Sequence, residues 1–207
     1  MGANGYPLIA REGLWLILPL AAVALLLAHF AGPLAGGLTA VLVALLAIKF
    51  RDPPRRVPPV PLGIVSPVDG RVTAIEPVED SCLTGPVLRL TLRVYPFPAY
   101  SIRTPVEGKV LEPPKGGRHG KLRRGLWLRT DEGDELILTL FGPRPGRPVS
   151  RTRYGARLGQ GHRCGWLRLG SHATLDIPAD SRLHVQVGDR VRSGSTVLAE
   201  FGRNGPA

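Results

Sequence analysis

The stretch Pro67-Val68-Asp69-Gly70-Arg71-Val72 returns later in the chain as Pro105-Val106-Glu107-Gly108-Lys109-Val110. In both copies an acidic residue and a glycine, which together favour a turn, open a strand-like alternating stretch. A third turn of similar character lies in Val187-Gly188-Asp189-Arg190-Val191-Arg192-Ser193-Gly194. Repeated units of turn and strand indicate that the second part of this chain is a β structure.

Short alternating or apolar runs, separated by Gly, Pro and Asp, surround these turns and predict further strands. The runs are RVTAIEP from Arg71, VLRLTLRVY from Val87, GLWLRT from Gly125, ELILTLF from Glu135, ATLDIP from Ala173, LHVQV from Leu183 and TVLAEF from Thr196. The 26 Gly and 21 Pro disfavour a helical bundle, because both residues penalise helix interiors. We therefore expect residues 63–207 to form one mainly β domain, a barrel or sandwich with β-turn-β units like those of the biotinyl/lipoyl hammerhead.

The N-terminal part differs, because no Lys, Arg, Asp or Glu occurs in the 35 residues from Leu14 to Ile48. One transmembrane helix needs about 20 apolar residues, and a segment containing Gly and Pro interrupts this run at residues 31–37. The pattern predicts two helices, about Leu14–Phe30 and Leu38–Phe50, that form a transmembrane hairpin within residues 1–50. Cations flank both outer ends, so the positive-inside rule predicts an inner-membrane anchor with the β domain on the cytoplasmic face.

Two alternatives to a spanning hairpin remain. A cleaved signal peptide would have a shorter apolar core and a small-residue cleavage site, whereas here a second apolar stretch follows the first. A re-entrant hairpin that enters one leaflet also fits, because the second helix is short. Residues 51–62, with the sequence RDPPRRVPPVP from Arg51, form a stiff, basic linker that would hold the β domain close to lipid headgroups.

The charge balance favours a lipid surface as a partner. Lys and Arg number 27 against 16 Asp and Glu, a net charge of +11, and every cation except Arg11 lies at or beyond Lys49. Nucleic acid is disfavoured, because 6% aromatic residues are too few for a stacking surface. The two cysteines, Cys82 and Cys164, form no CxxC motif and the histidines lack metal spacing, so we expect reduced structural thiols and no metal site.

Several short motifs occur in a fixed order after an early Arg11-Glu12-Gly13. They are Phe50-Arg51-Asp52-Pro53, Ser66-Pro67-Val68-Asp69-Gly70, Leu167-Arg168-Leu169-Gly170-Ser171 and Leu175-Asp176-Ile177-Pro178. Each motif alone is weak, but in this order and spacing the chain resembles the short, membrane-anchored phosphatidylserine decarboxylases. The resemblance covers nearly the whole length of the chain.

This resemblance implies an enzyme that converts phosphatidylserine to phosphatidylethanolamine through a self-generated pyruvoyl group. Decarboxylation of an amino acid needs an electron sink that side chains do not supply. By this resemblance, Ser171 would attack the carbonyl of Gly170. Cleavage would leave a β chain, 1–170, and an α chain, 171–207, and the α chain would begin with a pyruvoyl group derived from Ser171. Gly194-Ser195 is the only other Gly-Ser pair, and the order of motifs favours Gly170-Ser171.

The resemblance also implies a histidine, oriented by an aspartate, that activates the serine. Asp69 corresponds to the orienting aspartate, but the segment from Tyr95 to Pro105 contains no histidine. Arg103 and Tyr100 stand near the expected position. An arginine stays protonated and cannot serve as a base, so we expect both residues to contact the substrate, with Arg103 on its phosphate or carboxylate.

His172, directly after Ser171, is the candidate substitute base, and His119 and His162 are alternatives. The missing histidine also motivates a different function, that of a non-catalytic family member acting as a membrane-bound lipid-binding or adaptor protein. A homodimer is left open.

Overall fold

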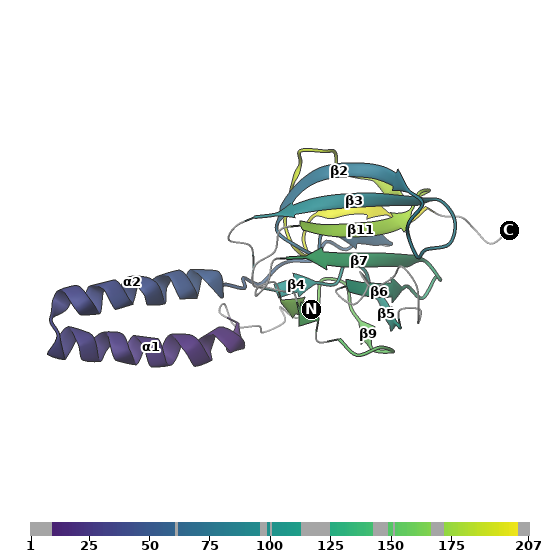
Figure 1. Ribbon diagram of the computed structural model, residues 1–207. Coiled ribbons are helices and arrows are strands. Elements are labelled where there is room, and N and C mark those ends of the chain that lie inside the picture. Colours follow the sequence, from purple (N-terminus) through teal and green to yellow (C-terminus); the bar gives the residue numbers. More distant parts are fainter. Residues whose placement is uncertain are drawn as a thin grey trace. The chain divides into compact units, whose positions relative to one another are not determined.

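The computed structural model describes residues 10–60, 62–95, 99, 101–112, 125–142, 149–150, 152–166 and 172–202 (Figure 1). The chain divides into two compact units, residues 1–54 and 55–207. The first unit is helical, and the second is built from strands.

Two antiparallel helices, α1 (Arg11–Phe30) and α2 (Pro33–Lys49), form the first unit. Gly32 between them has a φ of 96°, which glycine adopts freely, and Pro33 starts α2, where its missing N–H costs nothing. A Cβ on Gly36 would lie 2.4 Å from the Cβ of Ala28, so the helices approach closely because this residue has no side chain. The turn is therefore shorter than the predicted 31–37, since Gly36 belongs to the packed face of α2.

Helix α1 is long and apolar enough to cross a membrane, with an uninterrupted apolar window at Gly13–Phe30. Helix α2 is also apolar but shorter, at 17 residues. Large apolar side chains on both helices are exposed, among them Trp15 at 84% and Leu34 at 79%. Length and composition thus agree with a membrane helix in this part of the chain.

The second unit is mainly β, as predicted. Its largest sheet is antiparallel with the order β13-β2-β3-β11-β7-β6-β5-β9, and Figure 1 shows β2, β3, β11 and β7 side by side. The strands of this sheet are β2 (Gly70–Val78), β3 (Val87–Val94), β5 (Gly108–Leu111), β6 (Gly125–Arg129), β7 (Glu135–Phe141), β9 (Arg157–Leu158), β11 (His172–Pro178) and β13 (Arg190–Val191).

Two three-stranded sheets complete the unit, with the orders β1-β14-β12 and β4-β10-β8. Their strands are β1 (Gly63–Val65), β4 (Ser101–Arg103), β8 (Val149–Ser150), β10 (Arg163–Trp166), β12 (Arg182–Leu183) and β14 (Val197–Glu200). The predicted strand from Leu183 to Val187 is wrong beyond Leu183, because the chain leaves the sheet to reach the turn at Gly188. Alternate residues of β2, β3, β7 and β11 meet in one apolar core.

The two copies of the opening motif make reciprocal contacts. The Val65 N–H donates to the Pro105 carbonyl at 2.8 Å, and the Arg103 N–H donates to the Pro67 carbonyl at 3.0 Å. Residues 65 and 67 of the first copy correspond to residues 103 and 105 of the second. The two hydrogen bonds are therefore equivalent, one donated by each copy to the other. This is the pattern of an internal duplication with an approximate two-fold axis.

Each copy also pairs with its own later segment. Val72 exchanges backbone hydrogen bonds with residues 188–189, and Val110 does so with residues 155–156. The segments match as Gly188-Asp-Arg-Val-Arg-Ser-Gly194 and Gly155-Ala-Arg-Leu-Gly-Gln-Gly161, with positive φ at both ends of each. Only the C-terminal segment was predicted as a turn from the sequence, although both segments share the pattern Gly-x-Arg. The hammerhead type of these units stays a prediction.

Candidate functional site

Strands β2, β3 and β11 of the large sheet share one end, and Asp69 and His172 lie at this end. Strand β2 begins directly after Asp69, β3 ends at Val94 opposite Gly70, and β11 begins with His172 opposite Arg93. Neighbouring strands lie about 4.8 Å apart, so the start of β11 is about 10 Å from the start of β2. Gly170 and Ser171, which precede His172 in the sequence, lie outside the described residues.

Local chemistry explains the turn that presents Asp69. The Ser66 hydroxyl donates to the Val68 carbonyl at 2.7 Å and closes the turn. A Cβ on Gly70 would lie 2.3 Å from the Arg93 carbonyl oxygen, so only glycine lets β2 approach β3 here. The turn and its glycine fix where the Asp69 backbone stands.

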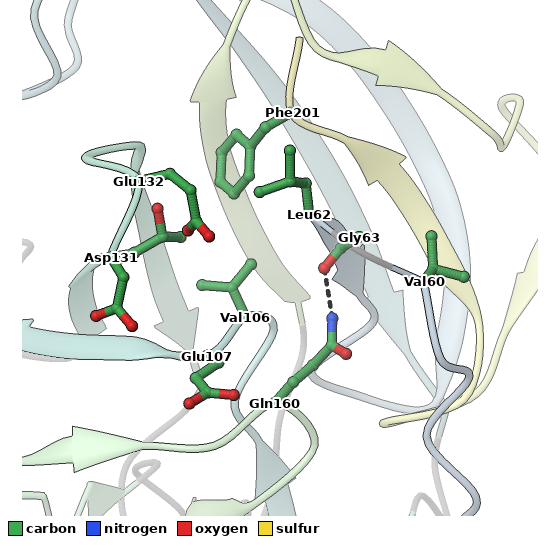
Figure 2. Close-up of a pocket in the computed structure, with 10 residues that line it drawn as sticks. Val60, Leu62, Gly63, Val106, Glu107, Asp131, Glu132, Gln160 and Phe201 are labelled. Atoms are coloured by element: carbon green, nitrogen blue, oxygen red, sulfur yellow. Dashed lines mark hydrogen bonds between the residues drawn. The ribbon is translucent and has the colours of Figure 1, made fainter. Parts of the chain in front are cut away.

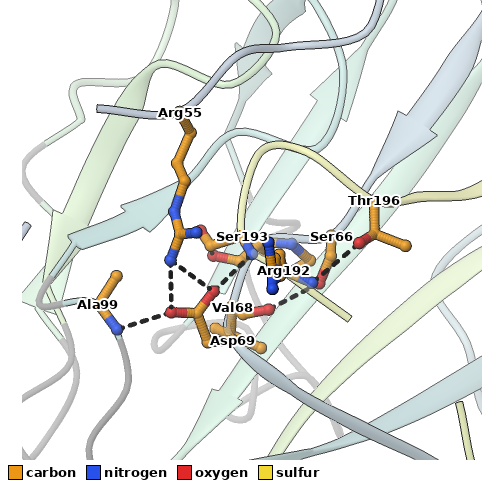
Figure 3. A network of polar contacts seen from close by, with 9 residues as sticks. Arg55, Ser66, Val68, Asp69, Ala99, Arg192, Ser193 and Thr196 are labelled. Atoms are coloured by element: carbon orange, nitrogen blue, oxygen red, sulfur yellow. Dashed lines mark hydrogen bonds and ion pairs between the residues drawn. The ribbon is translucent and has the colours of Figure 1, made fainter. Parts of the chain in front are cut away.

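Three donors converge on the carboxylate of Asp69 (Figure 3). Its Oδ1 accepts from the Ser193 N–H at 2.8 Å, and its Oδ2 accepts from the Ala99 N–H at 2.9 Å. Nη2 of Arg55 lies 3.1 Å from Oδ2. Asp69 is buried. Through these three contacts it joins the linker, the segment before β4 and the loop between β13 and β14. Within the described part of the chain, no histidine contacts this carboxylate.

Arg103 ends β4, donates its backbone N–H to the Pro67 carbonyl of that turn at 3.0 Å, and is buried, with 4% exposure. Its Nη1 donates to the Gly161 carbonyl at 3.1 Å. Its Cδ lies 2.6 Å from the place that a Cβ on Gly194 would take, so the bare glycine makes room for the guanidinium stem. The arginine joins the later segments of both copies. Substrate binding by Arg103 stays a prediction, and Tyr100 lies outside the described residues.

His172 opens β11, between Arg93 on β3 and Phe141 on β7. Its ring stacks on Phe141 with centroids 4.3 Å apart and an angle of 15° between the planes. The side chain is half-buried. This stacking orients the imidazole one residue after Ser171, but its role as a base stays a prediction. Of the alternative histidines, His162 is described and His119 is not.

The cysteines carry no sign of reactivity. Burial raises the pKa of the Cys164 thiol on β10 to about 12. The pKa of Cys82 is also raised, first by burial and then by the nearby carboxylates of Asp176 and Asp80. Across the described ranges, no three His, Cys, Asp or Glu side chains are grouped so that they could hold a metal ion.

An ion pair that the sequence analysis did not identify joins β3 to β11. Arg89 binds Asp176 with two bonds, Nε to Oδ1 at 2.6 Å and Nη2 to Oδ2 at 2.7 Å. The Ser81 hydroxyl adds a bond to Oδ2 at 2.9 Å. Asp176 belongs to the Leu175–Pro178 motif, but its partner follows only from the register of the two strands.

A cavity of about 300 Å³ lies at the second copy of the motif, not at Asp69 (Figure 2). Leu62, Val106 and Phe201 line it with apolar surface, and Glu107, Asp131 and Glu132 add carboxylates. Arg157 neutralises part of this charge, because it pairs with Glu107 at 3.1 Å and also with Asp131. Nothing in the cavity matches the residues expected for catalysis.

Comparisons with known proteins agree on one family. The family model of phosphatidylserine decarboxylase matches residues 42–113. Proteins named phosphatidylserine decarboxylase proenzyme are similar over nearly the full length. The one from Nitrosomonas eutropha is 35% identical, covering 95% of this chain and 96% of its own. The one from Aromatoleum aromaticum is 34% identical, covering 96% and 99%.

A solved structure, glucose permease IIA from Mycoplasma capricolum, is similar at a TM-score of 0.46 and 17% identity. The match covers 67% of this chain and 94% of that one. This likeness is too distant to add to the argument. The sequence relatives do add to it, because identity above 30% along the whole chain reflects common descent. The chain therefore belongs to the phosphatidylserine decarboxylase family.

Proposed function

We propose that this protein is a pyruvoyl-dependent phosphatidylserine decarboxylase, which converts phosphatidylserine to phosphatidylethanolamine in phospholipid biosynthesis. The observation that carries the proposal is the full-length similarity to proteins named as proenzymes. The name proenzyme agrees with a chain that must be processed before it acts. The apolar helices would anchor it in the inner membrane, with the β domain on the cytoplasmic face.

Maturation would proceed at Gly170-Ser171. The Ser171 hydroxyl adds to the Gly170 carbonyl, and the peptide bond becomes an ester. Elimination then releases the β chain, 1–170, with a free carboxylate, and hydrolysis with loss of ammonia leaves a pyruvoyl group on the α chain, 171–207. Once formed, this group supplies the electron sink for decarboxylation of the substrate amino acid.

By the strand order, the two product chains would stay together after a cut at this position. Three of the described strands after residue 171 pair with strands before it: β11 with β3 and β7, β13 with β2, and β14 with β1. The fourth, β12, pairs with β14. The Arg89–Asp176 ion pair and the bond from the Ser193 N–H to Asp69 also cross from one product chain to the other. A cut at 170–171 would therefore leave the described strand pairings intact, and the new α chain would begin one residue before His172.

In this proposal His172 is the base and its stacking on Phe141 orients the ring, while Asp69 holds the neighbouring turn in place through Ser193, Ala99 and Arg55. The adjacency of His172 to Ser171 and the orientation of its ring on Phe141 support this role. Arg103, with Tyr100, would contact the phosphate or carboxylate of the substrate. Since no histidine contacts Asp69 among the described residues, a non-catalytic lipid-binding protein is the second candidate function.

Denaturing electrophoresis and mass spectrometry of the purified chain test the proposal. We expect a C-terminal fragment of about 4 kDa, which is 37 of the 207 residues of a 22.2 kDa chain, with a blocked N-terminus. Ser171→Ala should abolish the fragment and the release of CO₂ from phosphatidylserine, whereas Ser195→Ala should retain both. Intact wild-type chain that binds phosphatidylserine vesicles without processing would favour the second candidate.

A further inference from the structure

Three arginines form a row across the exposed face of the large sheet, at the end where Asp69 lies. Arg71 on β2 stands directly opposite Arg93 on β3 and Arg190 on β13. Directly opposite residues of antiparallel strands point to the same face, with Cβ atoms about 5 Å apart. All three side chains are exposed. We call Arg71, Arg93 and Arg190 the arginine row.

Among the described residues, the arginine row has no acidic partner. Throughout the part of the chain that the structure describes, none of its three side chains forms an ion pair or a hydrogen bond. Apart from Glu12 in α1, every Asp and Glu of the chain has a described side chain. Like charges directly opposite one another on neighbouring strands repel. An anion bound from outside the protein would therefore stabilise the arginine row.

The internal duplication supplies a comparison. In the second copy, Lys109 on β5 stands opposite Arg129 on β6 and Arg157 on β9, so these cations form an equivalent row. There the protein provides its own anions. Arg157 pairs with Glu107 and Asp131, and Arg129 pairs with Glu135. The same geometry is thus neutralised in one copy and left open in the other.

The open charge is also confined to one end of the sheet. Arg89, further along β3, pairs with Asp176 and Asp80, so the cation at the far end has acidic partners within the protein. At the near end the arginine row continues into His172, which pairs with Arg93 in the sheet and follows Ser171 in the sequence. Arg55, which contacts Asp69 at this same end, comes six residues after α2 ends at Lys49.

We propose that the arginine row binds the phosphate groups of anionic phospholipids at the bilayer surface and so holds the Asp69 end of the sheet against the membrane. This inference rests on the proposed function and specifies the surface through which the enzyme meets its substrate. Guanidinium groups bind phosphate with two parallel hydrogen bonds, and three of them in a line suit a layer of headgroups better than one small anion. The lipids supply the anions that Glu107, Asp131 and Glu135 supply in the second copy.

The test uses the full chain in non-ionic detergent micelles with phosphatidylglycerol, an anionic lipid that lacks the amino group needed for decarboxylation. Native mass spectrometry counts the bound lipid. The variant R71Q/R93Q/R190Q should lose at least fivefold in affinity, and raised salt should weaken binding to the wild type. The matched variant K109Q/R129Q/R157Q removes the same charge from the equivalent row and should bind within twofold of the wild type.

Thermal unfolding separates lost binding from lost folding. Without lipid, neutralising the arginine row should leave the melting temperature unchanged or raise it, because repulsion is relieved, whereas the matched variant should melt lower because it loses ion pairs. If the triple variant fails to fold, the single variant Arg190→Glu is measured in the same way and should also weaken phosphatidylglycerol binding. Equal phosphatidylglycerol affinity in the two triple variants would overturn the inference.

Two further measurements keep the alternatives apart. Tighter binding of duplex DNA than of phosphatidylglycerol, lost in R71Q/R93Q/R190Q, would overturn the lipid assignment in favour of nucleic acid. The fragment of about 4 kDa is assayed in the same samples. Its absence with intact lipid binding counts against the decarboxylase only, and its presence with unchanged lipid binding in the variant counts against the arginine row only.

Discussion

Asp69 joins three segments that are far apart in the sequence. The resemblance implied an acid that orients a histidine, but the described contacts of Asp69 are two backbone N–H groups and the guanidinium of Arg55. A buried carboxylate that accepts charge-assisted bonds is costly to replace, because its donors lose their partner. At the scale of the residue, Asp69 therefore holds the site together whatever else it does in catalysis.

Arg55→Ala should destabilise the β domain by about 1–2 kcal/mol, because it removes one charge-assisted bond to a mostly buried carboxylate. Slower self-processing should accompany the loss, and Arg55→Lys should restore part of it. Arg56→Ala is the matched control, since Arg56 is the exposed neighbour and should behave as wild type. Urea denaturation and the rate of fragment release measure both effects. Equal behaviour of the two alanine variants would contradict this role.

Cys164 gives a prediction about pH. The folded protein raises the pKa of this thiol from 9.0 to about 12 by burial, so between these values the folded state keeps a proton that the unfolded state releases. The stability that depends on this proton is complete below pH 9 and falls as pH rises towards 12, by up to about 1.4 kcal/mol per pH unit. Urea midpoints from pH 8 to 11 should fall less steeply in Cys164→Ala, and parallel slopes would refute the prediction.

At the scale of the elements, two glycines in α2 have different surroundings. Gly36 faces Ala28 of α1 so closely that a Cβ would lie 2.4 Å from the Cβ of Ala28, whereas a Cβ on Gly37 would meet nothing within 4 Å. From the sequence, both glycines were predicted to lie in one turn at residues 31–37. Helix packing distinguishes them, because one is at the interface and the other is not.

Gly36→Ala should therefore push the two helices apart and destabilise the pair by about 1–3 kcal/mol, the usual cost of overpacking. Gly37→Ala should be neutral or stabilising by up to about 1 kcal/mol, since alanine favours helix. Thermal unfolding of both variants in the same detergent checks the difference. A Gly37→Ala variant that melts as low as Gly36→Ala would contradict the packing argument.

The pairing of β3 with β11 offers a second test at this scale. Arg89→Met removes one partner of a mostly buried, two-bond ion pair and should cost about 2–3 kcal/mol. Arg129→Met breaks a more exposed pair with Glu135 and should cost less than about 1 kcal/mol. Chemical denaturation compares them. If processing occurs, urea should also separate the two product chains of Arg89→Met at a lower concentration than those of the wild type.

At the scale of the whole molecule, the duplication explains why two chemically different surfaces share one geometry. Asp69 and Glu107 occupy equivalent turns, yet Asp69 is buried among three donors and Glu107 lies at the rim of a cavity. The rows of cations beside these turns also differ. The arginine row has no acidic partner among the described residues, whereas acidic side chains pair with the row of the second copy. The first copy is thus the one that offers charge to an outside partner.

Much of this organisation could be predicted from the sequence alone. The uncharged run from Leu14 to Ile48, the repeated turn motifs and the order of the short motifs are local patterns, and they were enough to predict helices, a β domain and the family. Local patterns suffice there because hydropathy and turn chemistry depend on neighbouring residues. Whether Ser171 is cleaved stays a prediction.

Only the tertiary structure decided which residues contact one another. Asp69 meets Ser193, Arg89 meets Asp176 and Arg71 meets Arg190 across separations of about a hundred residues, and these meetings depend on strand register. A shift by one residue would turn Arg71, Arg89, Arg190 and Asp176, which lie on strands, to the other face of the sheet. The folded sheet therefore determines which charges are neutralised, whereas the sequence alone determines which charged residues are present.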